Sequence, residues 1–244
     1  MIIIIGKKSF LANSLKLFLI KKKIKFLNIS YREISKITKI KELKKIFLFT
    51  FFFKKNELIK NISILKKIKK IKNFKLFYPS TIGLLSYKNL KKFNKNSYYL
   101  EKDKNEKFII SNFDSYNIFR IPNVYGLKMR SKTKFMLFSK LIKNNKKIKY
   151  VQNNSYRDYM YEEDLNKIFL YYLNKNIKKK IINLCSNNIY SEVQLIELMK
   201  KVLNKDYKKK INVINEEIAK LHHKRKTKNF KFIKLQKGLE KIIL

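Results

Sequence analysis

The first half of the chain alternates short apolar segments with longer segments of helical periodicity, and this alternation limits the possible folds most strongly. The apolar segments predict strands at 2–5, 24–29, 46–53, 75–78 and 117–121. Apolar residues at helical spacing predict helices at 11–22, 57–71 and 98–110. Strands that are apolar along nearly their whole length are typical of a sheet covered on both faces. The pattern therefore predicts an α/β fold built on a doubly wound parallel sheet.

The second half of the chain is less regular. Its periodicity predicts helices at 135–144, 164–174 and 192–203, a strand at 180–184, and a last helix at 230–244. No internal repeat or low-complexity linker separates it from the first half.

The formal net charge is +43, with 60 Lys and Arg against 17 Asp and Glu. Such a charge is compatible with a nucleic-acid-binding protein, which stays open as an alternative class. However, the lysines are spread along nearly the whole chain, and Gly, Pro and Trp are scarce or absent, as in proteins from A/T-rich genomes. We therefore expect no nucleic-acid partner, but a surface that attracts small anionic ligands.

The sequence indicates a cytoplasmic protein without a membrane span. Cys185 is the single cysteine, which excludes an internal disulfide and suits a reducing compartment. His222 and His223 have no cysteine or carboxylate at ligand spacing, so we expect no metal. No apolar segment approaches the length of a transmembrane helix, and the N-terminus lacks the basic segment of a signal peptide.

Tyr98 lies four residues before Lys102 in a predicted helix, so the phenol and the ammonium share one face. Because a nearby cation favours the phenolate, we expect Lys102 to lower the pKa of Tyr98. Such a pair can transfer a proton to or from a carbonyl or alcohol oxygen. The spacing alone is weak in so lysine-rich a chain, since Tyr87 and Lys91 share it and a surface stripe explains it too.

The turn after the first predicted strand is Gly6-Lys7-Lys8-Ser9-Phe10-Leu11-Ala12, and it opens the first predicted helix. At this place a dinucleotide-binding protein presents a glycine-rich turn and a helix N-terminus to the pyrophosphate. Only the first glycine is kept, with the small residues Ser9 and Ala12 at the other two places, so an ordinary strand-to-helix turn is an equal alternative. The candidate cofactor contacts here are Gly6, Ser9, Phe10, Leu11 and Ala12.

Further segments follow in a characteristic order. They are Tyr78-Pro79-Ser80-Thr81-Ile82-Gly83, then Tyr98 with Lys102 and Glu106, then Arg120-Ile121-Pro122-Asn123-Val124-Tyr125-Gly126, and finally Arg157-Asp158-Tyr159-Met160-Tyr161-Glu162-Glu163-Asp164-Leu165. Together with the glycine turn, they resemble the motifs of the extended short-chain dehydrogenase/reductase family, which includes the nucleotide-sugar epimerases, dehydratases and reductases.

The resemblance implies roles for the central residues. Tyr98 would be the general acid/base. Lys102 would lower its pKa and bond the nicotinamide ribose, which makes Lys102 a cofactor contact as well. Thr81 would hold the reacting sugar oxygen, with Ser80 as a neighbouring substrate contact. We expect Glu106 to pack or to pair rather than to react.

The resemblance extends to the flanking segments. Pro122 would lie at the cofactor, and Asn123 and Arg157 would contact the substrate. Asp164 would be the N-cap of the following helix. Asn61 matches an asparagine that the family often has in the helix before the Ser/Thr strand.

The residues after the second strand bear on the choice of cofactor. The segment from Asn28 to Arg32 contains no acidic residue that would accept the ribose hydroxyls of NAD. Ser30 and Arg32 are suited to a 2′-phosphate instead. We therefore expect NAD or NADP, with a slight preference for NADP.

The resemblance also implies the organisation and activity of the protein. A Rossmann-like dinucleotide-binding part would span 1–126 and a smaller C-terminal substrate-binding part 127–244, with 155–185 returning to the sheet. The expected activity is that of an NAD(P)-dependent oxidoreductase or epimerase acting on a nucleotide-activated sugar, in a possible homodimer. Dehydration is less expected, because no carboxylate follows Thr81. The alternative is a catalytically degenerate dinucleotide-binding regulator or partner subunit of the same fold.

Overall fold

The computed structural model describes residues 1–40, 42–52, 55–87, 97–127, 129, 133–148, 151–152, 156–205, 207, 213–214, 227 and 230–243. The chain divides into two compact units. Unit 1 comprises Met1–Ile121 and Asn166–Leu184, and unit 2 comprises Pro122–Leu165 and Cys185–Leu244.

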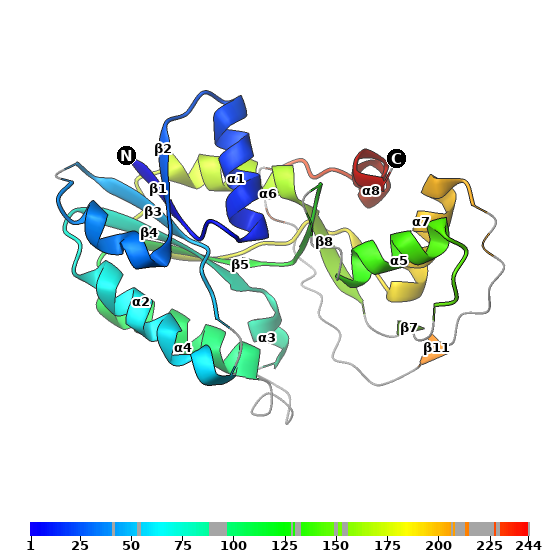
Figure 1. Ribbon diagram of the computed structural model, residues 1–244, viewed down its shortest axis with the longest axis horizontal. Helices are drawn as coiled ribbons and strands as arrows, with labels where there is room; N and C mark the ends of the chain where they lie inside the picture. The colour runs from blue at the N-terminus through cyan, green and yellow to red at the C-terminus, as the bar shows by residue number, and fades with distance from the viewer. Residues whose placement is uncertain are drawn as a thin grey trace. The chain divides into compact units, whose positions relative to one another are not determined.

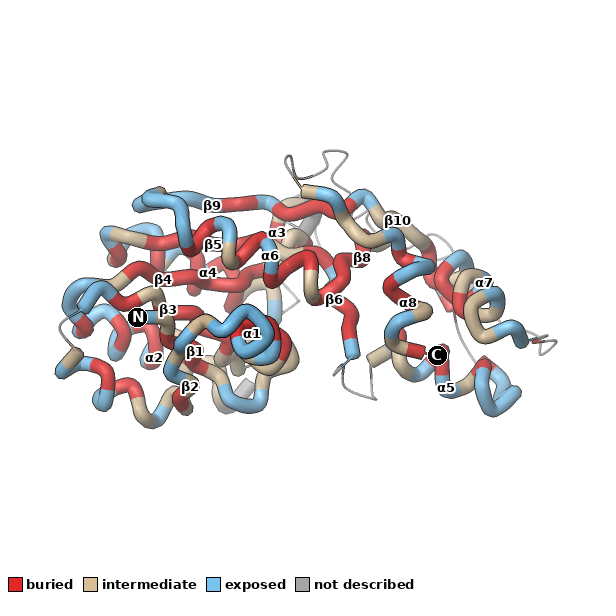
Figure 2. The backbone as a smooth tube through the Cα atoms, turned by 90° about the horizontal axis from the view of Figure 1, so that it is seen from above, coloured by how far each residue is buried: buried red, intermediate tan, exposed pale blue. Residues whose placement is uncertain are grey.

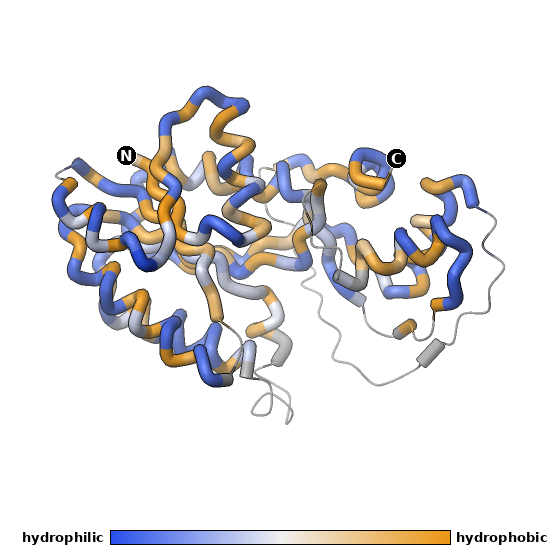
Figure 3. The backbone as a smooth tube through the Cα atoms, in the orientation of Figure 1, coloured by the Kyte–Doolittle hydropathy of each residue, from blue (hydrophilic) through white to orange (hydrophobic). Residues whose placement is uncertain are grey.

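Unit 1 is built on a parallel sheet in the order β2-β1-β3-β4-β5-β9 (Figure 1). The strands are β1 (Ile2–Ile5), β2 (Phe26–Ile29), β3 (Lys44–Leu48), β4 (Phe74–Thr81), β5 (Tyr116–Ile121) and β9 (Lys179–Asn183). Every neighbouring pair is parallel. The central strands are buried and apolar, as Figures 2 and 3 show.

Helices cover both faces of this sheet. On one face, α2 (Ile59–Lys69) and α4 (Ser97–Asn112) pack against apolar residues of β1, β3, β4 and β5. On the other face lie α1 (Phe10–Lys21) and α6 (Glu162–Leu173), and the Asn166 amide of α6 donates to the Ser14 hydroxyl of α1 at 2.8 Å. The prediction of a doubly wound α/β fold is therefore confirmed. The short elements are the 3-10 helices η1 (Tyr31–Ile37) and η2 (Lys55–Glu57) and the helix α3 (Gly83–Tyr87).

An aromatic layer fills the space between the sheet and α6. Phe47 stacks on Phe77 with ring centroids 4.6 Å apart, and Phe77 stacks on Phe119 at 6.2 Å. Phe169 of α6 meets Phe47 and Phe119 edge-on, at 5.3 and 5.0 Å. Such edge-on and offset contacts add to the free energy gained by burial. Phe169 therefore ties α6 to β3 and β5, the strands on either side of β4.

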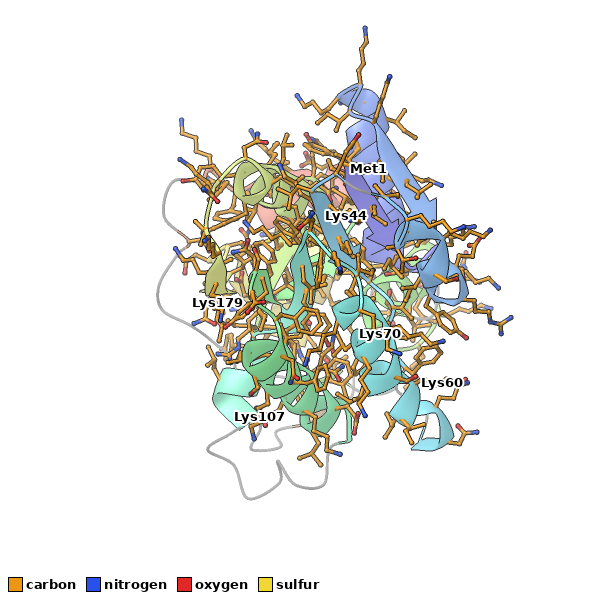
Figure 4. The ribbon with its side chains drawn as sticks, turned by 90° about the vertical axis from the view of Figure 1, so that its left-hand side faces the viewer. Met1, Lys44, Lys60, Lys70, Lys107 and Lys179 are labelled. Carbon is orange, nitrogen blue, oxygen red and sulfur yellow. The ribbon has the colours of Figure 1, made fainter. Side chains whose placement is uncertain are left out.

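Three lysines at the amino edge of the sheet bind main-chain carbonyls. Lys44, labelled in Figure 4, and Lys75 are buried, and Lys45 is half-buried. The Lys44 amine donates to Lys72 at 2.7 Å, the Lys45 amine to Leu173 at 2.8 Å, and the Lys75 amine to Lys175 at 3.2 Å. Leu173 is the last residue of α6, where the carbonyls lack partners within the helix. The three amines therefore bind backbone carbonyls at or just after the ends of helices, and not carboxylates.

One predicted strand is longer than the strand observed in the structure. The sequence predicts a strand at 46–53, whereas β3 ends at Leu48 and residues 49–52 form a loop. The Phe49 amide still donates to Ile5 at 2.8 Å, but β1 ends there and Gly6 turns toward Ile29. The apolar segment therefore continues beyond the end of the neighbouring strand β1. Hydrophobicity alone does not show where a strand loses its partner.

The described residues of unit 2 form two small sheets and three further helices. The first sheet has the order β10 (Ile189–Tyr190), β8 (Arg157–Tyr161), β6 (Asn123–Tyr125), and the second pairs β11 (Val213–Ile214) with β7 (Val151–Gln152). The helices are α5 (Lys134–Lys143), α7 (Glu192–Leu203) and α8 (Leu235–Ile243). The helix predicted at 192–203 has the observed bounds, while the short strands β6, β8 and β10 were not predicted. Across the described ranges, no helix has the length and apolarity that crossing a bilayer requires.

Phe169→Ala should lower the free energy of unfolding by about 3–5 kcal/mol, because it removes a fully buried ring and leaves a cavity. Denaturant unfolding measures this change. Tyr171→Ala on the exposed side of the same helix is the control, and it should cost about 1 kcal/mol or less. Equal losses in the two variants would contradict the role of the aromatic layer.

Candidate active site

The first site feature lies where the strand order reverses. From β1 the sheet is built outward to β2 on one side and to β3 on the other, and ligands of such sheets bind at the carboxyl ends of strands at this point. Gly6 follows β1 with φ +130°, and a Cβ there would lie 3.1 Å from the backbone of Phe49 and Thr50. A side chain would be both strained and crowded, so only glycine fits this turn.

The N-terminus of α1 follows directly. Ser9 occupies the N-cap position but makes no side-chain capping bond, and the first turn of α1 contains no acidic residue. Ala12 is buried, while Phe10 and Leu11 are half-buried. The dipole and the amide groups of this helix end are therefore suited to an anion such as a diphosphate. These are the residues that the sequence predicts at a dinucleotide.

Ser30 and Arg32 lie in a capped turn after β2. The Ser30 hydroxyl accepts from the Arg32 amide at 3.2 Å, and the Glu33 carboxylate accepts from the Ser30 amide at 2.9 Å. Glu33 also pairs with Lys7 at 3.1 Å and with Lys36 at 2.9 Å. These bonds lower its pKa to about 2, the Ser30 amide contributing most. Glu33 was not among the residues predicted from the sequence, although the Ser-x-x-Glu spacing of a capping box indicates its role.

Lys102 of α4 is buried beneath the end of β4. Its ammonium donates to the Pro79 carbonyl at 3.0 Å and to the Tyr78 hydroxyl at 3.4 Å. The Phe51 ring covers it, with its centroid 4.1 Å from Nζ. Burial lowers the pKa of Lys102 from 10.5 to about 7, although Glu106 nearby opposes the change. Lys102 is therefore a poorly solvated amine held between a strand end and an aromatic ring.

Tyr98 lies one turn before Lys102, and its ring is surrounded by aromatic rings. Phe51 meets it edge-on at 5.4 Å and Tyr99 at 5.2 Å. Burial raises the pKa of Tyr98 to about 12, although the residue remains 36% exposed. The predicted lowering of this pKa is wrong for the structure described. The Lys102 amine bonds to β4 and lies 6.0 Å from the Tyr98 ring centroid, so the loss of solvent dominates.

The end of β4 meets the start of α4 in unit 1. The Thr81 hydroxyl accepts from the Gly83 amide at 3.2 Å, and a Cβ on Gly83 would lie 2.6 Å from the Tyr99 ring. Glycine therefore lets Tyr99 pack on this turn. Ser80 is 2% exposed, and its hydroxyl has no partner within the described residues. The structure thus brings the strand end that carries Ser80 and Thr81 to the helix that carries Tyr98 and Lys102.

Two sets of polar contacts hold the elements around Tyr98 and Lys102 in place. The Glu106 carboxylate accepts three hydrogen bonds from the guanidinium of Arg120 in β5, at 3.2, 3.1 and 2.6 Å, so Glu106 pairs, as expected from the sequence. The Asn61 side chain of α2 accepts from the Phe52 amide at 2.8 Å and donates to the Phe52 carbonyl at 2.9 Å. Asn61 therefore holds the loop that places Phe51 over Lys102.

Other candidate residues belong to unit 2. Pro122 is buried, Asn123 is exposed at the start of β6, and Arg157 is half-buried at the start of β8. Their placement beside Tyr98 stays a prediction. Asp164 is not an N-cap, because α6 begins at Glu162; its carboxylate accepts from the Ile233 amide at 2.7 Å.

Some sequence candidates lie outside the described residues, namely Lys91, His222 and His223. Within the ranges that the structure describes, no group of three His, Cys, Asp or Glu side chains is placed to hold a metal ion.

Lys102→Met should remove a pH-dependent part of the stability. Above about pH 10.5 the amine is neutral in both states; as the pH falls toward about 7, only the unfolded chain takes up the proton. The wild-type free energy of unfolding should therefore rise between about pH 7 and pH 9, by up to about 1.4 kcal/mol per pH unit. Denaturant unfolding should show a smaller rise in Lys102→Met. Lys104→Met, which removes an exposed amine, is the control and should keep the wild-type dependence of the free energy of unfolding on pH. If Lys102→Met also kept that dependence, the Lys102 amine would not lose its proton on folding.

Comparisons with known proteins now add to this geometry. No family model and no curated protein matches the chain. Among solved structures, UDP-glucose 4-epimerase from Thermotoga maritima with UDP-glucose aligns with a TM-score of 0.76 at 16% identity, over 99% of this chain and 97% of that one.

Two further solved structures agree with the first. UDP-N-acetylglucosamine 4-epimerase from Methanobrevibacter ruminantium has a TM-score of 0.76 at 14% identity, over 99% of this chain and 96% of that one. The dTDP-glucose 4,6-dehydratase from Bacillus anthracis, solved with NAD, has a TM-score of 0.75 at 17% identity, over 99% and 94%. The chain therefore has the Rossmann-like fold of the extended short-chain dehydrogenase/reductase enzymes, the NAD-dependent epimerases and dehydratases.

Proposed function

We propose that the protein is an NAD(P)-dependent oxidoreductase or epimerase acting on a nucleotide-activated sugar. The observation that carries the proposal is the convergence of Tyr98 and Lys102 on one face of α4 with the end of β4, where Lys102 binds the Pro79 carbonyl at 3.0 Å. The neighbours of the same fold include structures solved with UDP-glucose and with NAD, which supports both ligand classes.

Tyr98 is the proposed general acid/base. Because burial raises its pKa to about 12, the phenol keeps its proton at neutral pH and is suited to donate it to a developing sugar alkoxide. In the reverse reaction, the oxidation of a sugar alcohol, Tyr98 must accept a proton as the phenolate. A charged Lys102 beside it favours the phenolate. Thr81 is proposed to hold the same sugar oxygen through its hydroxyl.

The residues around β1 fit a dinucleotide. A glycine turn without room for a Cβ and a helix N-terminus without an acidic first turn suit a diphosphate. We assign Gly6, Ser9, Phe10, Leu11 and Ala12 to this part. The bound nicotinamide would supply the hydride chemistry.

Contacts to the remaining parts of the ligands are proposals as well. Ser30 and Arg32 are assigned to the adenosine ribose, and Lys102 and Pro122 to the nicotinamide side. The Phe51 ring lies over this amine, with its centroid 4.1 Å from Nζ, and we expect the ring to move when a ribose hydroxyl binds there.

Substrate contacts are proposed for Ser80, Asn123 and Arg157, with 1–126 as the dinucleotide-binding part and 127–244 as the substrate-binding part. The buried Ser80 hydroxyl has no hydrogen-bond partner among the residues that the structure describes, which supports a substrate contact, since buried hydroxyls normally have a partner. Ile82 and Gly83 after Thr81 offer no carboxylate, so reduction or epimerisation is favoured over dehydration.

A catalytically degenerate dinucleotide-binding subunit is the second candidate. The Phe51 ring, held over Lys102 through the Asn61 clamp on Phe52, is the observation that favours it. Such a protein would bind the dinucleotide without turning over any nucleotide-activated sugar.

Tyr98→Phe should lower turnover at least about 100-fold, because it removes the proton that general acid/base catalysis needs. NAD(P)H oxidation or sugar interconversion, followed over a panel of nucleotide-activated sugars, measures the effect. Tyr99→Phe removes the hydroxyl of the neighbouring tyrosine and should keep most of the activity. Cofactor affinity should be similar in all three proteins. Equal turnover by Tyr98→Phe would reject the assignment, and a wild type that binds dinucleotide without turnover would favour the degenerate subunit.

NADPH should bind more tightly than NADH. Near Ser30, the cations Lys7, Arg32 and Lys36 outnumber the single Glu33 carboxylate, which two of them already pair. Arg32→Ala should weaken NADPH binding by about tenfold and change NADH binding less, since a charge-assisted bond to phosphate is lost. Lys39→Ala, which removes an exposed charge of the same segment, is the control for charge alone. Equal NADH and NADPH affinities in the wild type would remove the preference for NADP.

A further inference from the structure

Tyr78 is a fully buried tyrosine of β4 whose hydroxyl faces α4. The residue is 1% exposed, and its hydroxyl receives two hydrogen bonds. The Asn105 amide donates to it at 3.0 Å and the Lys102 amine at 3.4 Å. Both donors come from α4, where they stand one turn apart on the same face. The hydroxyl therefore links the two side chains within the core of unit 1.

Asn105 fixes the direction of this hydroxyl. The residue is 2% exposed, and its amide oxygen has no hydrogen-bond partner among the described residues. A buried amide that leaves half of its bonding capacity unused is costly. The bond to Tyr78 is therefore the one polar contact of the Asn105 side chain that the described structure shows, and it holds the oxygen where Lys102 reaches it.

The groups that face Lys102 carry little compensating charge. On its own helix, Tyr98 lies one turn before Lys102 and Glu106 one turn after it. Arg120 of β5 already engages the Glu106 carboxylate through three hydrogen bonds. From β4 come the neutral Tyr78 hydroxyl and Pro79 carbonyl, and from the loop after β3 comes the apolar Phe51 ring.

The two carboxylates that flank Lys102 in the sequence pair with other lysines. Glu101 of α4 pairs with Lys104 at 2.9 Å, and Asp103 pairs with Lys107 at 2.7 Å. The direct hydrogen bonds of the Lys102 ammonium that the described residues show therefore go to two neutral oxygens, while Glu106 acts only from nearby.

We propose that Tyr78, oriented by Asn105, is a positioning residue that favours the ammonium form of Lys102 over the neutral amine and holds it in place beside Tyr98. The importance of this ammonium for turnover rests on the proposed function. The contact itself is a property of the folded chain and is open to direct measurement.

The direction of the effect follows from the chemistry of the contact. The hydroxyl oxygen accepts from the ammonium, and it can instead donate to the neutral amine. Hydrogen bonds to a charged partner are roughly twice as strong as neutral ones, so the hydroxyl favours the ammonium overall. Without it, Lys102 should lose its proton at a lower pH. The alkaline limb of the rate profile, which reports loss of the ammonium, should move to lower pH as well.

Nuclear magnetic resonance of protein labelled with ¹⁵N-lysine tests the inference without substrate or cofactor. The Lys102 amine signal is assigned by its disappearance in Lys102→Met and followed through a pH titration. In Tyr78→Phe, the ratio of ammonium to amine at a given pH should fall about three- to tenfold relative to wild type. Tyr116→Phe removes a hydroxyl from the same core cluster without contact to Lys102 and should leave the titration unchanged.

Asn105→Leu provides a second variant if Tyr78→Phe does not fold. It leaves the hydroxyl in place but removes the group that orients it, and it should shift the Lys102 titration in the same direction. An unchanged or higher titration midpoint in the folded variant would overturn the proposal.

The pH profile of kcat/KM separates this proposal from the proposed function. If, in Tyr78→Phe, the alkaline limb of kcat/KM and the Lys102 titration both move to lower pH, the result supports the role of Tyr78 and the proposed function. A shifted titration in a protein that turns over no nucleotide-activated sugar supports the role of Tyr78 and rejects the enzymatic assignment. A normal titration in an active enzyme rejects the role of Tyr78 alone.

Discussion

The arrangement of unit 1 depends on one amine that is taken out of water. Lys102 has neutral oxygens on one side and an aromatic ring on the other, and its ordinary solvation is replaced by the Pro79 carbonyl, the Tyr78 hydroxyl and the face of Phe51. A buried cation costs free energy unless such partners are supplied. That requirement explains why the loop after β3, the end of β4 and the first turns of α4 meet at one place. It also makes the protonation state of the amine responsive near neutral pH.

The sequence predicted the parallel sheet well because its strands are buried on both faces and read as continuous apolar runs. It failed where hydrophobicity continues without pairing, as after Leu48. It also failed where strands are too short to show a period, as in β6 and β10 of unit 2. Strand ends depend on whether a neighbouring strand is still present, and that information lies in distant parts of the chain.

Some features of the candidate site could likewise be predicted from the sequence, and others could not. The spacing of Tyr98 and Lys102 and the single glycine after β1 were readable, because a helix face and a tight turn are local properties. The direction of the Tyr98 pKa was not, because the aromatic surroundings come from Phe51, far away in sequence. Tyr78 and Glu33 were assigned no role from the sequence for a related reason. A tyrosine inside an apolar strand looks like core, and a capping glutamate looks like surface, until the bonds they make are known.

The lysines at the amino edge of the sheet have a wider consequence. Lys44, Lys45 and Lys75 are anchored by main-chain oxygens, which every sequence provides at the ends of helices and turns. A protein that accumulates lysine can therefore place some of it inside without acquiring a matching acid for each one. Interactions of this kind involve no opposite charge, so added salt should screen them far less than surface ion pairs. A strongly basic chain can in this way keep an ordinary architecture while its isoelectric point drifts upward.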